Sequence, residues 1–152
     1  MAKKLANKEK GECWNMFSKM IRITRCLATT GLPFVGICLT CGCRRHISYL
    51  DAGHCFSGRS NVKLLNRKFV DIQCRNCNQV LNGKPKKFRK ILEGRYGVEY
   101  VERQEYRFKR IVIKDNKIKW ENRTKRYKQI IDNAMHEHGY KTYKEMLGMT
   151  RD

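Results

Sequence analysis

Apolar residues recur at helical spacing in several stretches of this chain. From Cys13 onward they fall at every third or fourth position, with basic side chains between them, which is typical of an amphipathic helix. Gly31 and Pro33 predict the end of this stretch, while Pro85 and Gly97 bracket a second one. The helices predicted in this way cover residues 13–27, 85–96, 99–108, 118–136 and 143–147.

The middle of the chain has a different pattern. Residues 38–83 are rich in Cys, Gly, Asn and His and lack helical periodicity, so we expect a loop-rich module that apolar packing alone does not organise. Short strands are predicted near Ile47–Leu50 and Gly53–Phe56. With 152 residues, the chain is long enough for one domain. We divide it into an N-terminal helical arm (1–37), this central module (38–83) and a C-terminal helical region (84–152).

The chain is strongly basic along its whole length. It has 34 Lys and Arg against 14 Asp and Glu, a formal net charge of +20. A folded body with this excess gains from binding a polyanion, because each neutralised phosphate releases counterions. Nucleic acid is therefore the first expected partner. No apolar run approaches the roughly 20 residues that span a bilayer. Residues 1–12 also lack the apolar stretch of a secretory signal, so we expect a cytoplasmic protein without a membrane partner.

Two C-x2-C pairs are the strongest local signal of chemistry. Eight cysteines in a reducing compartment favour metal ligation or buried thiols over disulfides. Each pair can wrap two thiolates around one ion, and two pairs complete the tetrahedral shell that structural zinc prefers. The four predicted zinc ligands are Cys38, Cys41, Cys74 and Cys77. Cys43 could replace a ligand of the first pair. The other cysteines, expected to be buried like small apolar side chains, are Cys13, Cys26 and Cys55.

Several motifs agree in order and spacing with one protein family. They are the run Phe17–Arg22, Thr30-Gly31, Cys38-x2-Cys41-Gly42, Ala52-Gly53-His54, Arg59, Gln73-Cys74-x2-Cys77-Asn78, Leu81-x-Gly83 and Tyr96-Gly97. On these motifs, residues 14–105 resemble the NinG (Rap) recombination proteins of lambdoid phages. The central module is also similar to the ββα-metal nucleases of the HNH superfamily, notably phage recombination endonuclease VII. The resemblance implies an α+β fold: a treble-clef-like ββα-metal module with structural zinc, flanked by N- and C-terminal helices.

The resemblance also implies a catalytic site for phosphodiester hydrolysis. In it, His54 would be the general base, Asn78 would bind a catalytic Mg²⁺ (or Mn²⁺), and Arg59 would clamp a phosphate. Histidine has an ordinary pKa near 6.5, so part of it is neutral at pH 7 and can accept a proton. An amide oxygen is a hard ligand that suits Mg²⁺. Asp51 is the first candidate for a second metal ligand, and Asp71 is the alternative.

Two positions depart from the pattern of the superfamily. Gly53 directly precedes the histidine, where many members carry an acidic residue or a second histidine. Phe69 stands where an asparagine usually braces the loop between the strands. These departures bear on the catalytic site and leave the cysteine pairs unaffected.

Together these features predict a Mg²⁺-dependent DNA endonuclease that acts on branched recombination intermediates, such as Holliday junctions or flaps, in the cytoplasm of the host cell. Basic residues after the second cysteine pair would contact backbone phosphates: Lys84, Lys86, Lys87, Arg89 and Lys90. Symmetrical cleavage of a junction would need a two-fold homodimer. The alternative is a non-catalytic zinc DNA-binding accessory protein of recombination, which needs neither His54 nor Asn78. An RNA-binding protein ranks below both, because the chain lacks the aromatic-rich strands of common RNA modules.

Overall fold

The protein has a mixed α+β fold with two small sheets. The structure is a computed structural model that describes residues 2–58 and 60–148, with side chains described from residue 7 onward. The helices are α1 (Ala2–Thr30), α2 (Asn61–Leu64), α3 (Pro85–Tyr96), α4 (Val98–Arg110), α5 (Trp120–Glu137) and α6 (Tyr143–Gly148). The strands are β1 (Val35–Ile37), β2 (Arg44–His46), β3 (Leu50–His54) and β4 (Val70–Cys74). Three shorter helical turns are η1 (Ile47–Tyr49), η2 (Asn76–Val80) and η3 (Asp115–Lys117).

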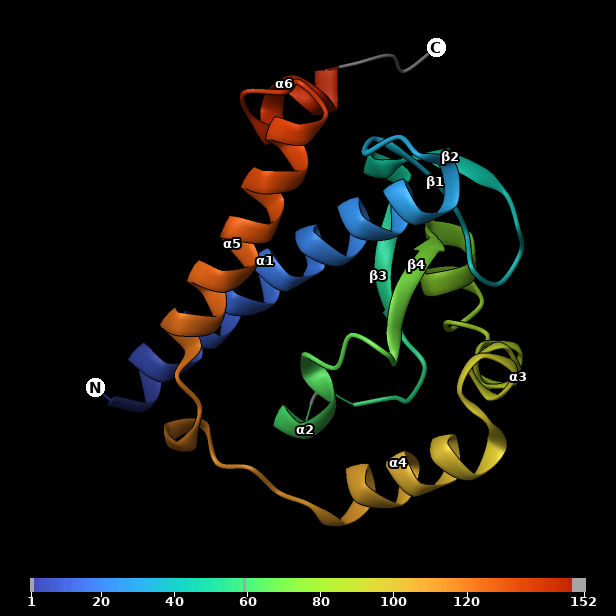
Figure 1. Ribbon diagram of the computed structural model, residues 1–152. Helices are drawn as coiled ribbons and strands as arrows, with labels where there is room; N and C mark the ends of the chain where they lie inside the picture. The colour runs from blue at the N-terminus through green and yellow to red at the C-terminus, as the bar shows by residue number, and fades with distance from the viewer. Residues whose placement is uncertain (1, 59, 149–152) are drawn as a thin grey trace.

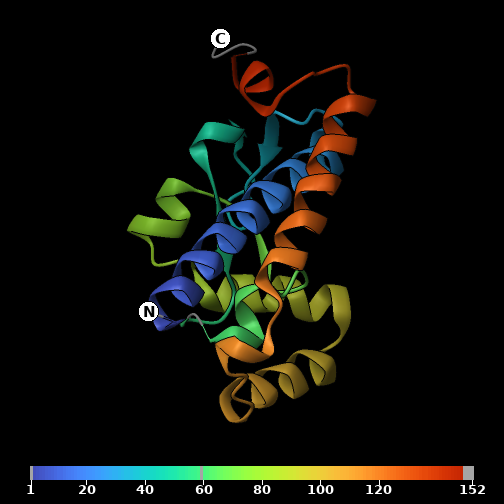
Figure 2. The same cartoon turned by 90° about the vertical axis from the view of Figure 1, so that its left-hand side faces the viewer.

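The long helices α1 and α5 lie side by side and form one wall of the molecule (Figures 1 and 2). Their facing sides are apolar because the buried residues recur at helical spacing. Phe17 of α1 is fully buried and meets the ring of Tyr127 of α5 edge to face, with 5.3 Å between ring centroids. Of these two helices, α1 is the one against which β1, β3 and β4 pack.

Two antiparallel hairpins carry the residues of the central module. β1 pairs with β2, and β3 pairs with β4 in a register that sets Asp51 opposite Gln73 and Gly53 opposite Asp71. Successive residues of a strand point to opposite faces. Leu50 and Ala52 pack with Ile72 in the core against α1, so Asp51 and Gly53 belong to the other face. That face is where the candidate site lies.

A second apolar cluster lies under α3 and α4, away from the α1–α5 pair (Figure 1). It is built mainly from aromatic and aliphatic side chains of these two helices and of the β3–β4 connection. Its buried members are Cys55, Phe69, Phe88, Leu92, Val101 and Phe108. Phe69 therefore fills a core where the superfamily pattern has a bracing asparagine.

The helices match their prediction more closely than the strands do. All five predicted helices are confirmed, although α1 begins eleven residues earlier than the predicted start at Cys13. The strand prediction near Ile47–Leu50 is wrong, because residues 47–49 form a 3-10 turn. The second predicted strand, Gly53–Phe56, overlaps only the end of β3, and β1, β2 and β4 were not predicted.

Candidate metal centre and candidate active site

The four predicted zinc ligands come together between the two hairpins. Cys38 and Cys41 lie in the loop that joins β1 to β2, Cys74 ends β4, and Cys77 lies in η2. Their four sulfur atoms all lie within 4.8 Å of one another. This is the arrangement that a tetrahedral tetrathiolate site needs, and zinc is the metal that such a site prefers.

The first knuckle is a tight turn closed by its own backbone. The Cys38 N–H donates to the Cys43 carbonyl and the Gly42 N–H donates to the Cys38 carbonyl, both at 2.9 Å. Gly42 has a φ of +75°, a conformation that glycine adopts without strain. Cys43 Sγ lies 3.2 Å from Cys41 Sγ, so a fifth thiol stands beside the four-sulfur cluster.

Hydrogen bonds favour the thiolate form of one cysteine in this knuckle. Burial opposes ionisation of the Cys38 thiol, but hydrogen bonds with the backbone of Cys74 and Cys41 outweigh it and lower its pKa to about 6. The thiolate is the form that ligates metal. By contrast, burial raises the pKa of both Cys26 and Cys55 to about 12. Those two cysteines, like Cys13, are buried in the core, which confirms the prediction for them.

Asp51 and Asn78 meet on the face of the β3–β4 hairpin that points away from α1. The Asn78 amide Nδ2 donates to Asp51 Oδ2 at 3.0 Å, and Gln79 Nε2 donates to the same oxygen at 2.8 Å. Asn78 directly follows the predicted zinc ligand Cys77, so the knuckle fixes its position. The structure therefore brings together the carboxylate and the carboxamide that were expected to bind Mg²⁺.

Gly53, which has no side chain, lies on this face, and the amide oxygens of Gln73 and Asn78 converge beside it. A methyl group on Gly53 would clash with Gln73 Oε1 and would lie 2.9 Å from Asn78 Oδ1. Gln73 Oε1 is buried and has no hydrogen-bond partner among the described residues. Carboxylate and amide oxygens are the ligands of Mg²⁺ and Mn²⁺. The donor set around Gly53 thus fits the divalent cation that the resemblance implies.

His54 does not join this group. Since neighbouring strand residues point to opposite faces, its ring leaves β3 on the α1 side and stacks on Trp14, with 5.0 Å between ring centroids. His54 and Asn78, which the resemblance places in one catalytic site, therefore lie on opposite faces of the β3–β4 hairpin in this structure. His54 Nε2 lies 3.1 Å from the Leu64 carbonyl oxygen. A carbonyl only accepts, so this contact places the proton of a neutral ring on Nε2.

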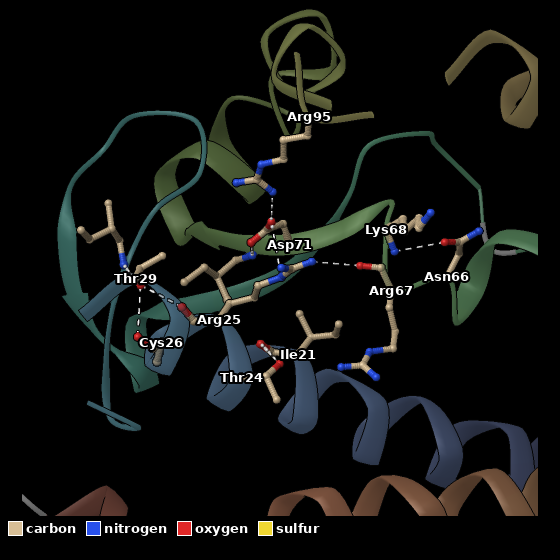
Figure 3. A network of polar contacts seen from close by, with 12 residues as sticks. Ile21, Thr24, Arg25, Cys26, Thr29, Asn66, Arg67, Lys68, Asp71 and Arg95 are labelled. Atoms are coloured by element: carbon tan, nitrogen blue, oxygen red, sulfur yellow. Dashed lines mark hydrogen bonds and ion pairs between the residues drawn. The ribbon is translucent and has the colours of Figure 1, made fainter. Parts of the chain in front are cut away.

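Asp71, the alternative metal ligand, is occupied by arginines. Figure 3 shows Arg25 of α1 and Arg95 of α3 converging on its carboxylate. Arg95 lies 2.7 Å and Arg25 3.5 Å from Oδ2, and the Ile72 N–H donates to Oδ1 at 2.7 Å. Both oxygens of this buried side chain therefore have partners, and Asp71 braces α1 and α3 against β4.

The predicted DNA-contacting residues divide into two groups. Three lysines of α3 are exposed, as a phosphate contact requires: Lys86, Lys87 and Lys90. Lys84 is half-buried and caps α3 in a left-handed conformation. Arg89 pairs with Glu93 at 2.7 Å and with Glu105, so its charge is already matched. Arg59, predicted to clamp a phosphate, lies outside the described residues.

Sequence reasoning missed the residues that link the two sites. Gln73 Nε2 donates to Thr40 Oγ1 at 3.1 Å and to the Gly83 carbonyl at 2.8 Å, and Gln79 binds Asp51. A signal was present in the alternation of Val70, Asp71, Ile72 and Gln73, which predicts a strand with its polar residues on one face.

The fold and the metal centre define a mixed α+β protein with a four-cysteine site that could hold a structural metal such as zinc. The chain belongs to the NinG family: the family model described as "Bacteriophage Lambda NinG protein" matches residues 2–137. This membership indicates a role in phage recombination. Comparison with curated proteins and with solved structures found no match. Among the described helices, none has the length and apolar character needed to cross a membrane.

Proposed function

We propose that this protein is a divalent-cation-dependent DNA endonuclease of phage recombination, with the ββα-metal type of site. The observation that carries the proposal is the meeting of Asp51 with Asn78 beside Gly53, one residue from a zinc knuckle. The order of elements supports it too, because an antiparallel hairpin is followed directly by the helical turn η2 that bears Asn78. A structural metal would thereby hold the ligands of the catalytic metal in place.

The chain's own residues would divide the chemistry between the two faces of β3. Asp51 and Asn78 would hold Mg²⁺, which when bound polarises the phosphate and stabilises the leaving oxygen. In-line displacement sets the attacking and leaving oxygens on opposite sides of phosphorus. A phosphate at the unpaired edge of β3, beside Gly53, would then have the cation ligands on one side and His54 on the other. The imidazole of His54 would accept the proton of the attacking water.

The substrate we propose is branched DNA. The net charge of +20 and the exposed lysines of α3 suit the closely spaced phosphates of a junction or flap. A cation site of this kind acts on one strand at a time, so symmetrical cleavage of a four-way junction would need two copies related by a two-fold axis. A homodimer on DNA is therefore part of the proposal.

One observation favours a second candidate function, a non-catalytic zinc DNA-binding accessory protein. The ring of His54 is stacked on Trp14 rather than turned toward Asn78, as a histidine with only a packing role would be. An accessory protein would use the zinc centre and the positive surface in the same way. It would bind branched DNA with no need for Asp51, Asn78 or His54.

Cleavage of defined DNA substrates separates these two candidates. We expect the zinc-loaded chain to cut four-way junctions or flaps in Mg²⁺ or Mn²⁺, under single-turnover conditions. Asp51→Asn should slow cleavage by at least about 10-fold through loss of a metal ligand. His54→Ala should slow it by about 100-fold or more, because general-base catalysis is worth that much.

Matched controls come from exposed residues of α5. Asp132→Asn and His136→Ala remove the same chemical groups outside the site and should cut at the wild-type rate. DNA binding, measured without a catalytic cation, should be unchanged in all four variants. Binding of branched DNA by the wild type with no product in either metal would contradict the nuclease proposal and support the accessory role.

A further inference from the structure

Gln73 is a fully buried polar side chain whose amide is fixed in one orientation. Its Nε2 donates to the Gly83 carbonyl at 2.8 Å and to Thr40 Oγ1 at 3.1 Å. Because a carbonyl oxygen only accepts hydrogen bonds, the nitrogen must point toward Gly83. The oxygen Oε1 consequently points the other way, toward Gly53.

This oxygen is an acceptor without a donor among the described residues. Buried polar atoms are nearly always paired, and an unpaired one destabilises the folded state. No described donor lies where Oε1 points. Oε1 is directed instead toward the place that a side chain on Gly53 would occupy. The Asn78 Oδ1 atom, which is also an acceptor, is directed toward the same place. Two acceptors directed to one place require a hydrogen-bond donor or a cation between or beside them, and a cation with oxygen ligands can bind both.

We propose that Gln73 Oε1 is a third protein ligand, with Asn78 and Asp51, for a hard divalent cation. This inference rests on the proposed function. Neutral amide oxygens commonly ligate such cations, and Mg²⁺ takes few protein ligands while keeping several waters. The glycine at position 53 then has a physical reason: any side chain there would fill the space into which the two amide oxygens point.

Gln73 also ties the cation site to the zinc centre. Thr40, which receives its Nε2 hydrogen bond, lies between two zinc ligands, and Thr40 Oγ1 is 3.6 Å from Cys38 Sγ. Gly83, the other acceptor, donates its own N–H to the Cys77 carbonyl at 2.8 Å. The Gln73 side chain thus links both knuckles to the proposed cation. Its amide nitrogen binds the residues of the knuckles, and its oxygen would bind the cation.

The test is Mn²⁺ binding to the zinc-loaded, full-length protein, followed by the electron paramagnetic resonance signal of free Mn²⁺. We expect one Mn²⁺ per chain in the wild type. Gln73→Met, which has similar length and no oxygen, should weaken Mn²⁺ binding by about 10-fold or more. Gln73→Glu keeps an oxygen ligand and should bind Mn²⁺ at least as tightly as the wild type. Gln129→Met, an exposed glutamine of α5, is the matched control and should change nothing.

Zinc content and melting temperature distinguish a ligand from a purely structural glutamine. If only the Nε2 hydrogen bonds matter, both Gln73 variants lose zinc or stability together and Gln73→Glu gains no Mn²⁺ affinity, which would overturn the proposal. Gly53→Ala keeps the glutamine at position 73 but places a methyl group against Gln73 Oε1 and Asn78 Oδ1, so it should also weaken Mn²⁺ binding. Wild-type Mn²⁺ affinity in both Gln73→Met and Gly53→Ala would also overturn the proposal.

The outcomes separate this inference from the nuclease proposal. Mn²⁺ binding that depends on Gln73, without DNA cleavage, would leave the ligand assignment standing and contradict the enzyme. DNA cleavage together with Mn²⁺ binding that does not depend on Gln73 would contradict the ligand assignment and leave the nuclease proposal standing. A wild-type protein that binds no Mn²⁺ would contradict both.

Discussion

The behaviour of each carboxylate in this protein depends on which side chains surround it. Asp51 is half-buried, accepts hydrogen bonds from two amide nitrogens and forms no ion pair with the described residues, so its charge is available to a cation. Asp71, two positions from Gln73 on the same strand, is buried between Arg25 and Arg95. One carboxylate therefore belongs to the candidate site and the other to the framework.

We predict that Asp71→Ala lowers the free energy of unfolding by about 3 kcal/mol. The change leaves two guanidinium groups without their shared anion and a buried Ile72 N–H without an acceptor. Urea unfolding measures the difference. Asp132→Ala on the exposed side of α5 serves as control and should stay within about 0.5 kcal/mol of the wild type. An Asp71→Ala protein as stable as this control would show that the arginines have no role in bracing the helices.

Residue spacing could predict the zinc ligands but not the partners of the other polar groups. The two C-x2-C pairs need only local turns to present four thiolates, so the sequence alone predicts them. Whether Asp51 or Asp71 is free for a cation depends on where α1 and α3 place Arg25 and Arg95, which is a tertiary property. Gln73 was missed for the same reason, because its oxygen is significant only once Gly53 lies opposite it.

At the scale of elements, helices were predicted well because their apolar residues repeat over many turns. The strands are only three to five residues long, so each offers at most two or three repeats of the apolar and polar alternation that marks a strand. Hairpin β1–β2 is closed by the knuckle between Cys38 and Cys43 rather than by a common hairpin turn. Its sequence therefore lacks the turn residues by which a hairpin is usually recognised.

The pairing of α1 with α5 yields a prediction for packing. Phe17→Ala should lower the free energy of unfolding by about 3–5 kcal/mol, the usual cost of removing a fully buried aromatic ring. Denaturant unfolding followed by circular dichroism measures it. Val112→Ala, which truncates an apolar side chain that is 86% exposed, is the control and should change little. A loss below about 1 kcal/mol in Phe17→Ala would mean that this helix pair is not a central part of the core.

At the scale of the whole molecule, the excess positive charge predicts how DNA binding depends on salt. Each phosphate contact contributes about 0.9 to the slope of log affinity against log salt. Replacing three exposed lysines of α3 by glutamine (Lys86, Lys87 and Lys90) should reduce this slope by nearly three if all of them contact phosphates. A control with the same change in charge replaces Lys114, Lys125 and Lys128, which are also exposed. Equal slopes in the two triple variants would show that α3 is not a DNA-contacting face.

At the four-cysteine site, one bound metal ion would hold the β1–β2 loop, the end of β4 and η2 together. A ligand that binds only the folded state stabilises it, so stability should rise by about 1.4 kcal/mol for each tenfold increase in free zinc above the dissociation constant. We therefore expect the melting temperature to fall in a strong chelator and to recover when zinc is restored. Cys38→Ser, which removes one ligand, should melt at a temperature that responds far less to zinc. A wild-type melting temperature that changes with neither chelator nor zinc would mean that the four sulfurs hold no structural metal. In that case no metal would fix the position of Asn78.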